Sequence, residues 1–336
     1  MNKKLSKNII WILVLAIGTV IIIRKNSPER YTQVQGTIFG TLYSITYQSN
    51  ENLKTEIEEE LNRFDYSLST FKEQSIISKV NKNEEVELDT LFTNVFNKSL
   101  EISKLTNGAF DITVAPLVNA WGFGFKQGDF PDSLMINNLL KYTGFDKVKL
   151  ENGKVVKDND QIILDCSAIA KGYAVDVIGD FLTRKEIENF IIDIGGEILT
   201  KGVNPDGNAW RIAISKPIDD ATAISNEVEL ILNLKNKALA TSGNYRNFYI
   251  KDGKKYAHTI NPKSGYPVQH NILSATVVAN DCMTADALAT SFMVVGLKQA
   301  LEILTQIDEV EACFIYTDEN GDYQTYLTEG LKEFIN

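Results

Sequence analysis

The sequence predicts an α+β fold, one domain of two lobes in which helices pack against mixed, mostly antiparallel sheets. Apolar residues recur at helical spacing in some segments and at strand spacing in others, without the strict strand–helix–strand rhythm of a parallel sheet. Turn signals such as Asn152-Gly153 and Asn320-Gly321 join neighbouring apolar runs, as in antiparallel hairpins. A chain of 336 residues, of which 44% are hydrophobic, can bury one large core or two lobes.

The N-terminal segment, residues 1–25, is typical of a signal anchor. Lysines precede the apolar run Ile9–Ile23, and Arg24 and Lys25 close it. The run is short against the roughly 20 residues that span a bilayer, but its flanking basic side chains can extend to the interfaces. We therefore expect an uncleaved anchor in the inner, cytoplasmic membrane, with the remaining chain on the periplasmic, outer face. A cleaved signal peptide is the alternative.

The next elements are expected to be two strands and two long helices. Strands are predicted at Tyr31–Gly36 and Leu42–Tyr47, where apolar and polar residues are bounded by turn residues. Amphipathic helices are predicted from Leu53 to Leu68 and from Leu91 to Leu105, because their apolar residues recur at three- and four-residue spacing. The glycine–aromatic alternation of Trp121–Phe125 suits a loop that wraps a flat group, or one tethered to the core.

A stretch in the middle of the chain organises the predicted fold. Ile162–Leu164 is typical of a buried strand, and the apolar residues from Ala170 onward follow helical spacing. Asp165 to Lys171 should then form a strand-to-helix turn, whose free backbone N–H groups can bind phosphate. The ordinary alternative is that Asp165 only caps the helix.

The last part of the chain is predicted to consist mainly of paired strands, with two helices. We expect helices at Met283–Val295 and Lys298–Ile307. Strands are expected at Phe190–Ile194, Trp210–Ser215, Val228–Leu234, Tyr245–Ile250, Lys255–Ile260, Leu273–Ala279, Ala312–Thr317 and Tyr323–Thr328.

Two residues of the first of these helices can form part of a cation site. Asp286 and Thr290 stand four residues apart, so they share one helix face and can hold one hard cation between two oxygens. The ordinary alternative is a polar pair on a helix surface.

Composition limits the possible ligands. The net charge of −10 and the lack of a basic stripe argue against a nucleic-acid partner. Cys166, Cys282 and Cys313 lie far apart without a CxxC pair, which does not describe a zinc site or a disulfide framework. A negatively charged cofactor would need a cation or helix N-termini to offset the charge of the protein.

Nine short motifs, in order along the chain, resemble the ApbE family of FAD:protein FMN transferases. Each motif is weak alone, but nine in register cover nearly all of the chain from about Gly36 to the last strand. The motifs are Gly40-Thr41, Ser69–Phe71, Phe110–Thr113, Leu117–Gly124, Leu164–Asp176, Asp193–Glu197, Thr241–Tyr245, His258–Pro267 and Thr284–Thr290.

The resemblance implies a magnesium-dependent transferase domain over residues 36–330, after a linker at 26–35. Such an enzyme cleaves FAD, attaches FMN through a phosphoester bond to a threonine of a target protein and releases AMP. The implied targets are subunits of sodium-pumping or related membrane electron-transfer complexes.

Carried over by position, the resemblance also implies the site residues. The metal would be held by the Ala168 carbonyl oxygen, the Asp286 carboxylate and the Thr290 hydroxyl. The implied FAD contacts are Phe39, Phe71, Ala109, Phe110, Asp111, Asp165, Lys171 and Ile260. Phe39 stands where the family usually has Met, Phe71 where Tyr is common, and Asn261 where Asp is usual.

His258 and Asp286 are the expected catalytic residues. His258 is one of two histidines, the other being His270, and it lies beside a motif implied to contact FAD. We expect it to act as a base or to orient the acceptor hydroxyl, with a purely structural histidine as the alternative.

Two other functions are compatible with the same motifs. A magnesium-dependent FAD pyrophosphatase would use water as the acceptor and give free FMN and AMP. A membrane-anchored flavin-binding protein would retain FAD without turnover.

Overall fold

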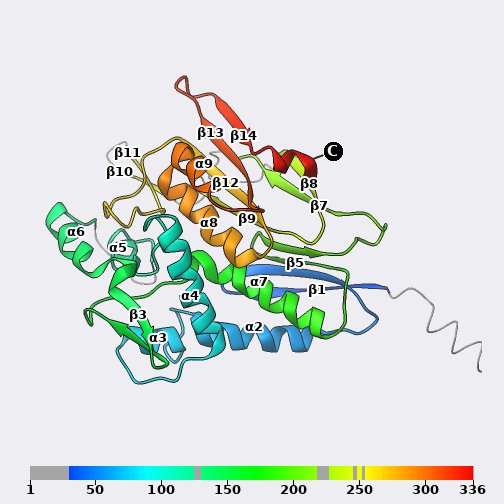
Figure 1. Ribbon diagram of the computed structural model, residues 1–336, viewed down its shortest axis with the longest axis horizontal. Coiled ribbons are helices and arrows are strands. Elements are labelled where there is room, and N and C mark those ends of the chain that lie inside the picture. The colour runs from blue at the N-terminus through cyan, green and yellow to red at the C-terminus, as the bar shows by residue number, and fades with distance from the viewer. Residues whose placement is uncertain (1–29, 125–129, 218–226, 245–247, 252–253, 336) are drawn as a thin grey trace, which may run out of the picture.

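An eight-stranded antiparallel sheet forms the centre of the computed structural model, which describes residues 30–124, 130–217, 227–244, 248–251 and 254–335 (Figure 1). The predicted N-terminal anchor and Phe125 lie outside these residues. In spatial order, the strands are β1 (Tyr31–Ile38), β2 (Thr41–Gln48), β5 (Phe190–Ile194), β6 (Glu197–Lys201), β9 (Ala238–Gly243), β12 (Ile272–Ala279), β13 (Glu311–Thr317) and β14 (Tyr323–Leu327).

In the described part of the chain, three further antiparallel hairpins flank the sheet: β3–β4 (Val148–Glu151, Lys154–Lys157), β7–β8 (Trp210–Ser215, Val228–Leu234) and β10–β11 (Phe248–Lys251, Lys254–Ala257). The helices are α2 (Lys54–Leu68), α3 (Ile76–Asn81), α4 (Thr90–Leu105), α5 (Ala115–Ala120), α6 (Ser133–Leu139), α7 (Ser167–Arg184), α8 (Cys282–Val295) and α9 (Leu297–Leu304). The predicted α+β fold, with mostly antiparallel sheets and packed helices, is confirmed.

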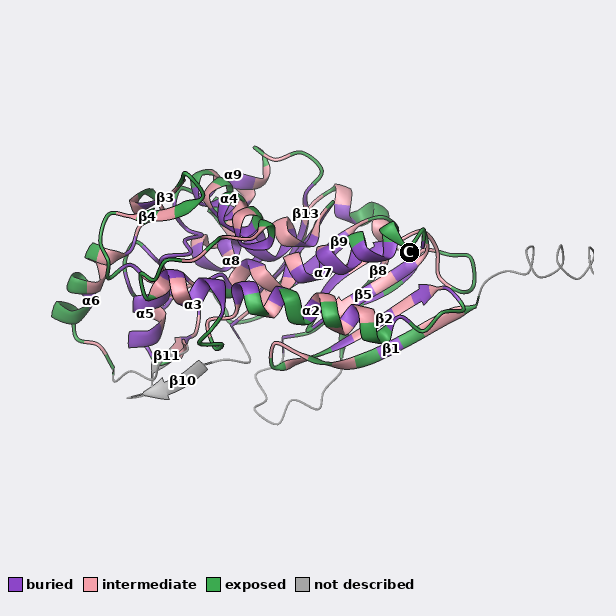
Figure 2. Cartoon of the chain, turned by 90° about the horizontal axis from the view of Figure 1, so that it is seen from below, coloured by how far each residue is buried: buried purple, intermediate pink, exposed green. Residues whose placement is uncertain are grey.

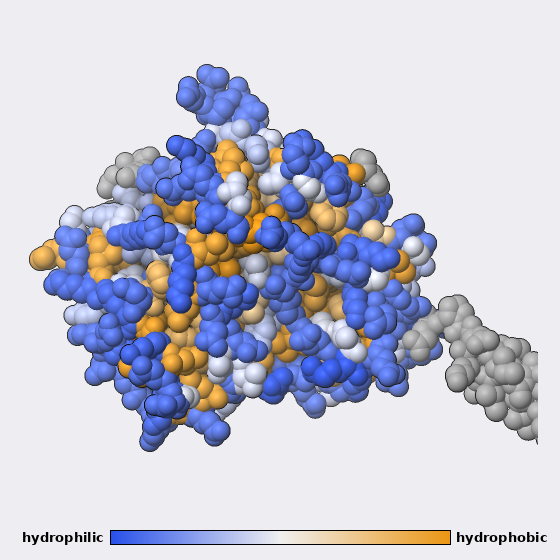
Figure 3. All heavy atoms as spheres, viewed as in Figure 1, coloured by the Kyte–Doolittle hydropathy of each residue, from blue (hydrophilic) through white to orange (hydrophobic). Residues whose placement is uncertain are grey.

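Helices cover one face of the sheet and a hairpin covers part of the other. The larger core cluster joins β2, β5 and β12 to α2, α4, α7 and α8, whereas a smaller cluster packs the β7–β8 hairpin against β6, β9 and β13. Figure 2 shows α7 largely buried beneath α2, whose outer turns are exposed. The face in Figure 3 is mainly hydrophilic, with small hydrophobic areas between polar side chains. Within the described residues, no helix is long and apolar enough to span a membrane.

The strand predicted at Ile162–Leu164 is wrong. These residues form no strand, and α7 begins at Ser167 after an irregular segment. The side chain of Asn81 takes the place of a partner strand: its Oδ1 accepts a hydrogen bond from the Leu164 N–H at 2.7 Å, and its Nδ2 donates to the Leu164 carbonyl at 2.9 Å. The apolar run is buried because Asn81 satisfies the backbone polar groups that burial would leave unpaired.

The central helices α7 and α8 pack unusually closely at Gly172. A Cβ at this position would lie 2.2 Å from the carbonyl oxygen of Cys282 and 2.8 Å from the Cβ of Asp286. One carboxylate from each helix stabilises this contact between α7 and α8. Asp286 of α8 accepts a hydrogen bond from the Gly172 N–H at 2.9 Å, and Asp176 of α7 accepts from the N–H groups of Cys282 and Met283, each at 2.8 Å.

Gly172→Ala should lower the free energy of unfolding by about 2 kcal/mol, because the new methyl group meets backbone of α8 that cannot rotate away. Gly179→Ala, in the same helix, is the matched control. A Cβ there would lie 2.5 Å from the end of the Leu199 side chain, which can move, and alanine gains about 1 kcal/mol of helix propensity. Urea denaturation of both variants measures the difference. Equal stabilities would contradict the close backbone contact.

Candidate functional site

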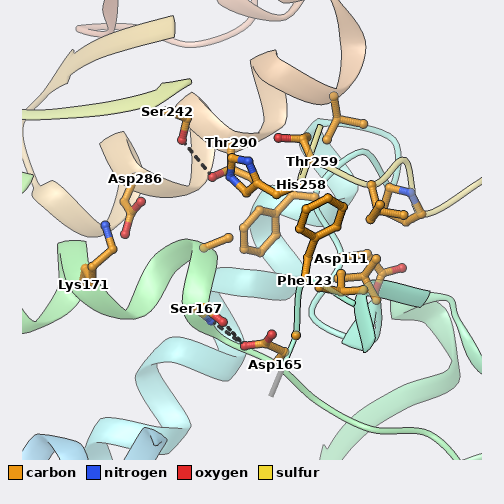
Figure 4. Close-up of a pocket in the computed structure, with 18 of the residues that line it drawn as sticks. Asp111, Phe123, Asp165, Ser167, Lys171, Ser242, His258, Thr259, Asp286 and Thr290 are labelled. Atoms are coloured by element: carbon orange, nitrogen blue, oxygen red, sulfur yellow. Dashed lines mark hydrogen bonds between the residues drawn. The ribbon is translucent and has the colours of Figure 1, made fainter. Parts of the chain in front are cut away.

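A pocket of about 570 Å³ opens where α7, α8 and β9 meet the segments 109–124 and 258–262 (Figure 4). Ten residues implied by the resemblance line it: Phe71, Ala109, Phe110, Asp111, Asp165, Ala168, Lys171, Ile260, Asp286 and Thr290, together with His258. Phe39 instead lines an adjoining cavity of about 480 Å³. The two cavities share the wall residues Thr70, Phe71, Asp165, Ser167 and Lys171.

Three oxygen-bearing residues meet at the wall between α7 and α8. The buried Asp286 carboxylate binds the N–H of Gly172, which stands four residues after Ala168 in α7. In an α-helix this N–H points at the carbonyl of Ala168, so the Asp286 carboxylate lies beside that carbonyl. One turn further along α8, the Thr290 hydroxyl is 3.1 Å from the Ser242 hydroxyl. Ala168, Asp286 and Thr290 thus line the same pocket.

This oxygen set depends on backbone and hydroxyl groups as well as on a carboxylate. Among the described residues, no group of three or more His, Cys, Asp and Glu side chains is arranged to hold a metal ion. A hard cation such as Mg²⁺ accepts carbonyl, hydroxyl and carboxylate oxygens and keeps water and phosphate ligands, so it does not need such a group.

Lys171 lies opposite Asp286 and forms an ion pair with Glu197 (Figure 4 labels the first two). Burial lowers the pKa of Lys171, but the carboxylates of Asp286 and Glu197 raise it by more. The pKa of Lys171 therefore lies above its ordinary value. Burial raises the pKa of Asp286, although the ammonium of Lys171 and the N–H of Gly172 each lower it in part. The pKa of Glu197 is also raised, mainly by burial and to a smaller extent by the Asp286 carboxylate. Two buried carboxylates thus face one ammonium, which favours a cation in the pocket.

The Asp165 side chain forms hydrogen bonds with Ser167, the first residue of α7. Its Oδ1 accepts hydrogen bonds from the N–H of Ser167, at 2.8 Å, and from the Ser167 hydroxyl. Its own N–H donates to the Ile112 carbonyl at 2.7 Å, which joins the helix start to the 109–114 loop. The ordinary alternative is that Asp165 caps the helix, but Cys166 is the N-cap of α7 and makes no side-chain cap hydrogen bond. Asp165 stands one residue before it and lines both cavities.

Asp111 lines the pocket, but its carboxylate is used within the protein. It is buried and accepts hydrogen bonds from the Thr113 N–H at 2.8 Å, the Thr113 hydroxyl at 2.6 Å and the Phe145 N–H at 2.9 Å. Burial raises the pKa of Asp111, and these hydrogen bonds lower it. Asp111 therefore shapes the loop that carries Ala109 and Phe110.

Phe39 occupies the turn between β1 and β2 in a left-handed conformation, with φ of 52°. A bulky residue rarely adopts this conformation, which costs roughly 1–2 kcal/mol. It directs the ring onto Phe64, with centroids 5.6 Å apart, at the wall of the adjoining cavity. Phe71 lines both cavities with its side chain 80% exposed. Two aromatic rings are thus available to a flat ligand.

The two histidines have different surroundings. The ring of His258 lies in the pocket, edge-on to Phe123 with centroids 6.3 Å apart. His270 is held by backbone: its Nε2 lies 2.6 Å from the Met293 carbonyl oxygen, and its Nδ1 accepts from the Ile272 N–H at 3.3 Å. Burial lowers the pKa of His270. Only His258 of this pair is placed to meet a ligand in the pocket.

Sequence reasoning did not select Glu197 or Ser242 as site residues, although both lie in motifs that carry the resemblance. Glu197 follows the paired glycines at the end of β5 and begins β6, so its side chain enters the pocket wall beside Lys171. The usable signal was an acidic residue directly after a glycine turn at a strand end, where backbone lies close to a ligand.

Comparison with known proteins identifies the relatives of this chain. The model of the ApbE family matches residues 39–314. The chain belongs to the ApbE family. It is 34% identical over 337 residues to a FAD:protein FMN transferase of Vibrio cholerae, covering 97% of this chain and 99% of the relative. A protein of the same name from Haemophilus influenzae is 36% identical over 305 residues, with coverages of 86% and 87%.

Solved structures of the ApbE family have the same fold. Flavin transferase ApbE from Vibrio cholerae matches with a TM-score of 0.82 and 34% identity, covering 92% of this chain and all of the other. The ApbE protein of Thermotoga maritima matches with a TM-score of 0.79 and 28% identity, covering 91% and 100%.

Asp111→Asn should lower the free energy of unfolding of this ApbE-family chain by about 1–3 kcal/mol. The amide nitrogen would face an N–H donor, so one buried hydrogen bond would be lost. Asp146→Asn, at a neighbouring exposed residue, should stay within about 0.5 kcal/mol of the unchanged protein. Chemical denaturation measures both. An Asp111→Asn protein of unchanged stability would mean that the carboxylate does not hold the loop.

Proposed function

We propose that this chain is a magnesium-dependent FAD:protein FMN transferase. It cleaves FAD, attaches FMN through a phosphoester bond to a threonine of an acceptor protein and releases AMP. The observation that carries the proposal is the meeting of Ala168, Lys171, Asp286 and Thr290 in one pocket of an ApbE-family fold. The names of the relatives from Vibrio cholerae and Haemophilus influenzae support the same activity.

The two adjoining cavities suit the shape of FAD. FAD has two aromatic ring systems joined through a diphosphate, and the cavities are joined along a polar wall that includes Asp165, Ser167 and Lys171. The Lys171 ammonium offers a positive charge to the diphosphate. Phe39 and Phe71 offer ring faces to an aromatic group. The proposal therefore assigns the diphosphate to the shared wall.

The donor set suits Mg²⁺. The Ala168 carbonyl, the Asp286 carboxylate and the Thr290 hydroxyl are hard oxygen donors, and the second carboxylate of Glu197 leaves an excess of buried negative charge. When bound, the cation would polarise the phosphate and stabilise the charge that develops on the leaving AMP.

The chain's own groups have separate tasks in the proposed transfer. A bond forms between the threonine Oγ and the FMN phosphorus, while the bond from that phosphorus to the bridging oxygen breaks and AMP leaves with the oxygen. Lys171 holds the phosphate oxygens in position, and positioning with charge stabilisation dominates such reactions. His258 takes the proton of the threonine hydroxyl or orients it, because it is the histidine that lines the pocket.

The proposal includes a membrane location. The apolar run Ile9–Ile23, with basic residues on both sides, supports an anchor in the inner membrane. The domain would then lie on the periplasmic face, close to acceptor subunits of sodium-pumping or related electron-transfer complexes. Two alternatives keep the same pocket: an FAD pyrophosphatase that releases FMN and AMP without an acceptor, and a binding protein that retains FAD.

Asp286→Asn should reduce flavinylation of a threonine-bearing acceptor by about 100-fold or more, because one charge that holds the cation is lost. Asp180→Asn, at an exposed position of α7, should leave the rate within about two-fold. Mass spectrometry of the acceptor, incubated with FAD and Mg²⁺, follows the transfer. EDTA should stop it and excess Mg²⁺ should restore it. An active Asp286→Asn protein would contradict the proposed metal set.

The same incubation without acceptor separates the alternatives. Chromatography of free nucleotides should give little AMP for a transferase. Rapid release of FMN and AMP would favour the pyrophosphatase, and intact FAD both with and without acceptor would favour the binding protein.

Phe39→Asn should weaken FAD binding by about five-fold. Asparagine tolerates the left-handed backbone, so the loss reports the missing ring, for which about 1 kcal/mol is typical. Phe39→Tyr keeps the ring and serves as the control. Titration of FAD fluorescence measures both dissociation constants. Equal affinities of the two variants would remove Phe39 from the FAD site.

A further inference from the structure

Glu197 carries an unsatisfied polar atom at the pocket wall. The residue is 3% exposed and begins β6, directly after the turn at Gly195-Gly196. One carboxylate oxygen, Oε1, pairs with the ammonium of Lys171. The other, Oε2, is buried and has no hydrogen-bond partner among the described residues. Among the described residues, Glu197 is the only charged residue with a buried side-chain atom that lacks a hydrogen-bond partner.

An unpartnered carboxylate oxygen is costly inside a protein. A buried acceptor that gives up water without a new donor loses about 1–3 kcal/mol, and more when it is charged. Asp286 adds to the cost, because its carboxylate is also buried and repels that of Glu197, whereas the Lys171 ammonium and the backbone N–H of Glu197 itself stabilise the charged form. Such an atom is expected where a water molecule or a ligand supplies the missing donor.

The inference rests on the proposed function, because it concerns the same cation. Mg²⁺ has six ligand positions and gives up its waters reluctantly. The proposed protein oxygens, from Ala168, Asp286 and Thr290, occupy three positions, and two oxygens of a diphosphate would occupy two more. One position is left for water, whose hydrogens need an acceptor.

We propose that Glu197 Oε2 accepts a hydrogen bond from a water molecule bound to the cation, while Oε1 holds Lys171. Glu197 thereby acts as a positioning residue that supports the cation through its hydration shell and keeps the Lys171 ammonium directed into the pocket. Carboxylates in this second layer around a metal change its affinity by about 10- to 100-fold when they are replaced.

Glu197→Gln tests the proposal sharply. The Lys171 ammonium can only donate hydrogen bonds, so it draws the amide oxygen toward itself. The amide nitrogen then takes the place of Oε2 and presents a donor where the water needs an acceptor. The substitution keeps the size of the side chain and the contact with Lys171. It replaces the hydrogen-bond acceptor at the Oε2 position with a donor.

Asp193→Asn is the matched control. Asp193 belongs to the same glycine turn, and its Oδ1 accepts from the Gly196 N–H at 2.9 Å, a bond that asparagine can keep. Asp193 lines a neighbouring cavity and not the main pocket.

The experiment measures binding of Mn²⁺, a spectroscopic substitute for Mg²⁺, to the full-length protein with FAD by electron paramagnetic resonance. Glu197→Gln should weaken Mn²⁺ binding at least ten-fold, and Asp193→Asn less than two-fold. FAD affinity measured without metal should stay within about two-fold for both variants, because Lys171 keeps its partner.

Equal Mn²⁺ affinities of Glu197→Gln and the unchanged protein would overturn this proposal and leave the proposed transferase intact. No Mn²⁺ binding by the unchanged protein would overturn both. A thermal unfolding scan shows whether the variant folds. If it does not, electron–nuclear double resonance of the unchanged protein in ¹⁷O-labelled water decides: a bound water supports the proposal, and none overturns it.

Discussion

The site depends on the close contact of α7 and α8 at Gly172. Because no side chain separates the helices there, the Asp286 carboxylate of α8 reaches a backbone N–H of α7 at 2.9 Å, beside the carbonyl of Ala168. Asp176 binds the first N–H groups of α8 in the reverse direction. These two carboxylates fix the axial position of one helix against the other. An oxygen set drawn from two helices keeps its geometry only if that position is fixed.

Charge balance explains why so few reactive side chains suffice. The pocket places two buried carboxylates against one ammonium, in a protein with a net charge of −10. A diphosphate alone would add to this negative charge, whereas a divalent cation bound with it would offset the added charge. Phosphoryl transfer is accelerated mainly by positioning and charge stabilisation. In the proposed function, the cation and the diphosphate therefore favour each other's binding in this pocket.

Local sequence patterns predicted most elements and part of the site. The apolar spacing that predicted α2, α4, α7 and α8 depends on burial of one helix face, which is a local property. The placement of Asp286 and Thr290 on one helix face, which lines the pocket, followed from helix geometry for the same reason. The strand expected at Ile162–Leu164 failed because Asn81, 83 residues away from Leu164, supplies its hydrogen bonds. The Glu197 ion pair with Lys171 likewise joins β6 to α7, which no local pattern contains.

Two energetically unfavourable features lie at the walls of the two cavities. Phe39 keeps a left-handed backbone at one wall, and Glu197 keeps an unpaired charged oxygen at another. Asp111, a buried carboxylate of the same pocket, has hydrogen-bond partners for both of its oxygens. Folding alone favours neither the strain nor the unpaired charge, since each lowers stability. Under the proposed function, an aromatic, anionic ligand and its cation would offset both costs, so that stability lost in the free protein would contribute to affinity.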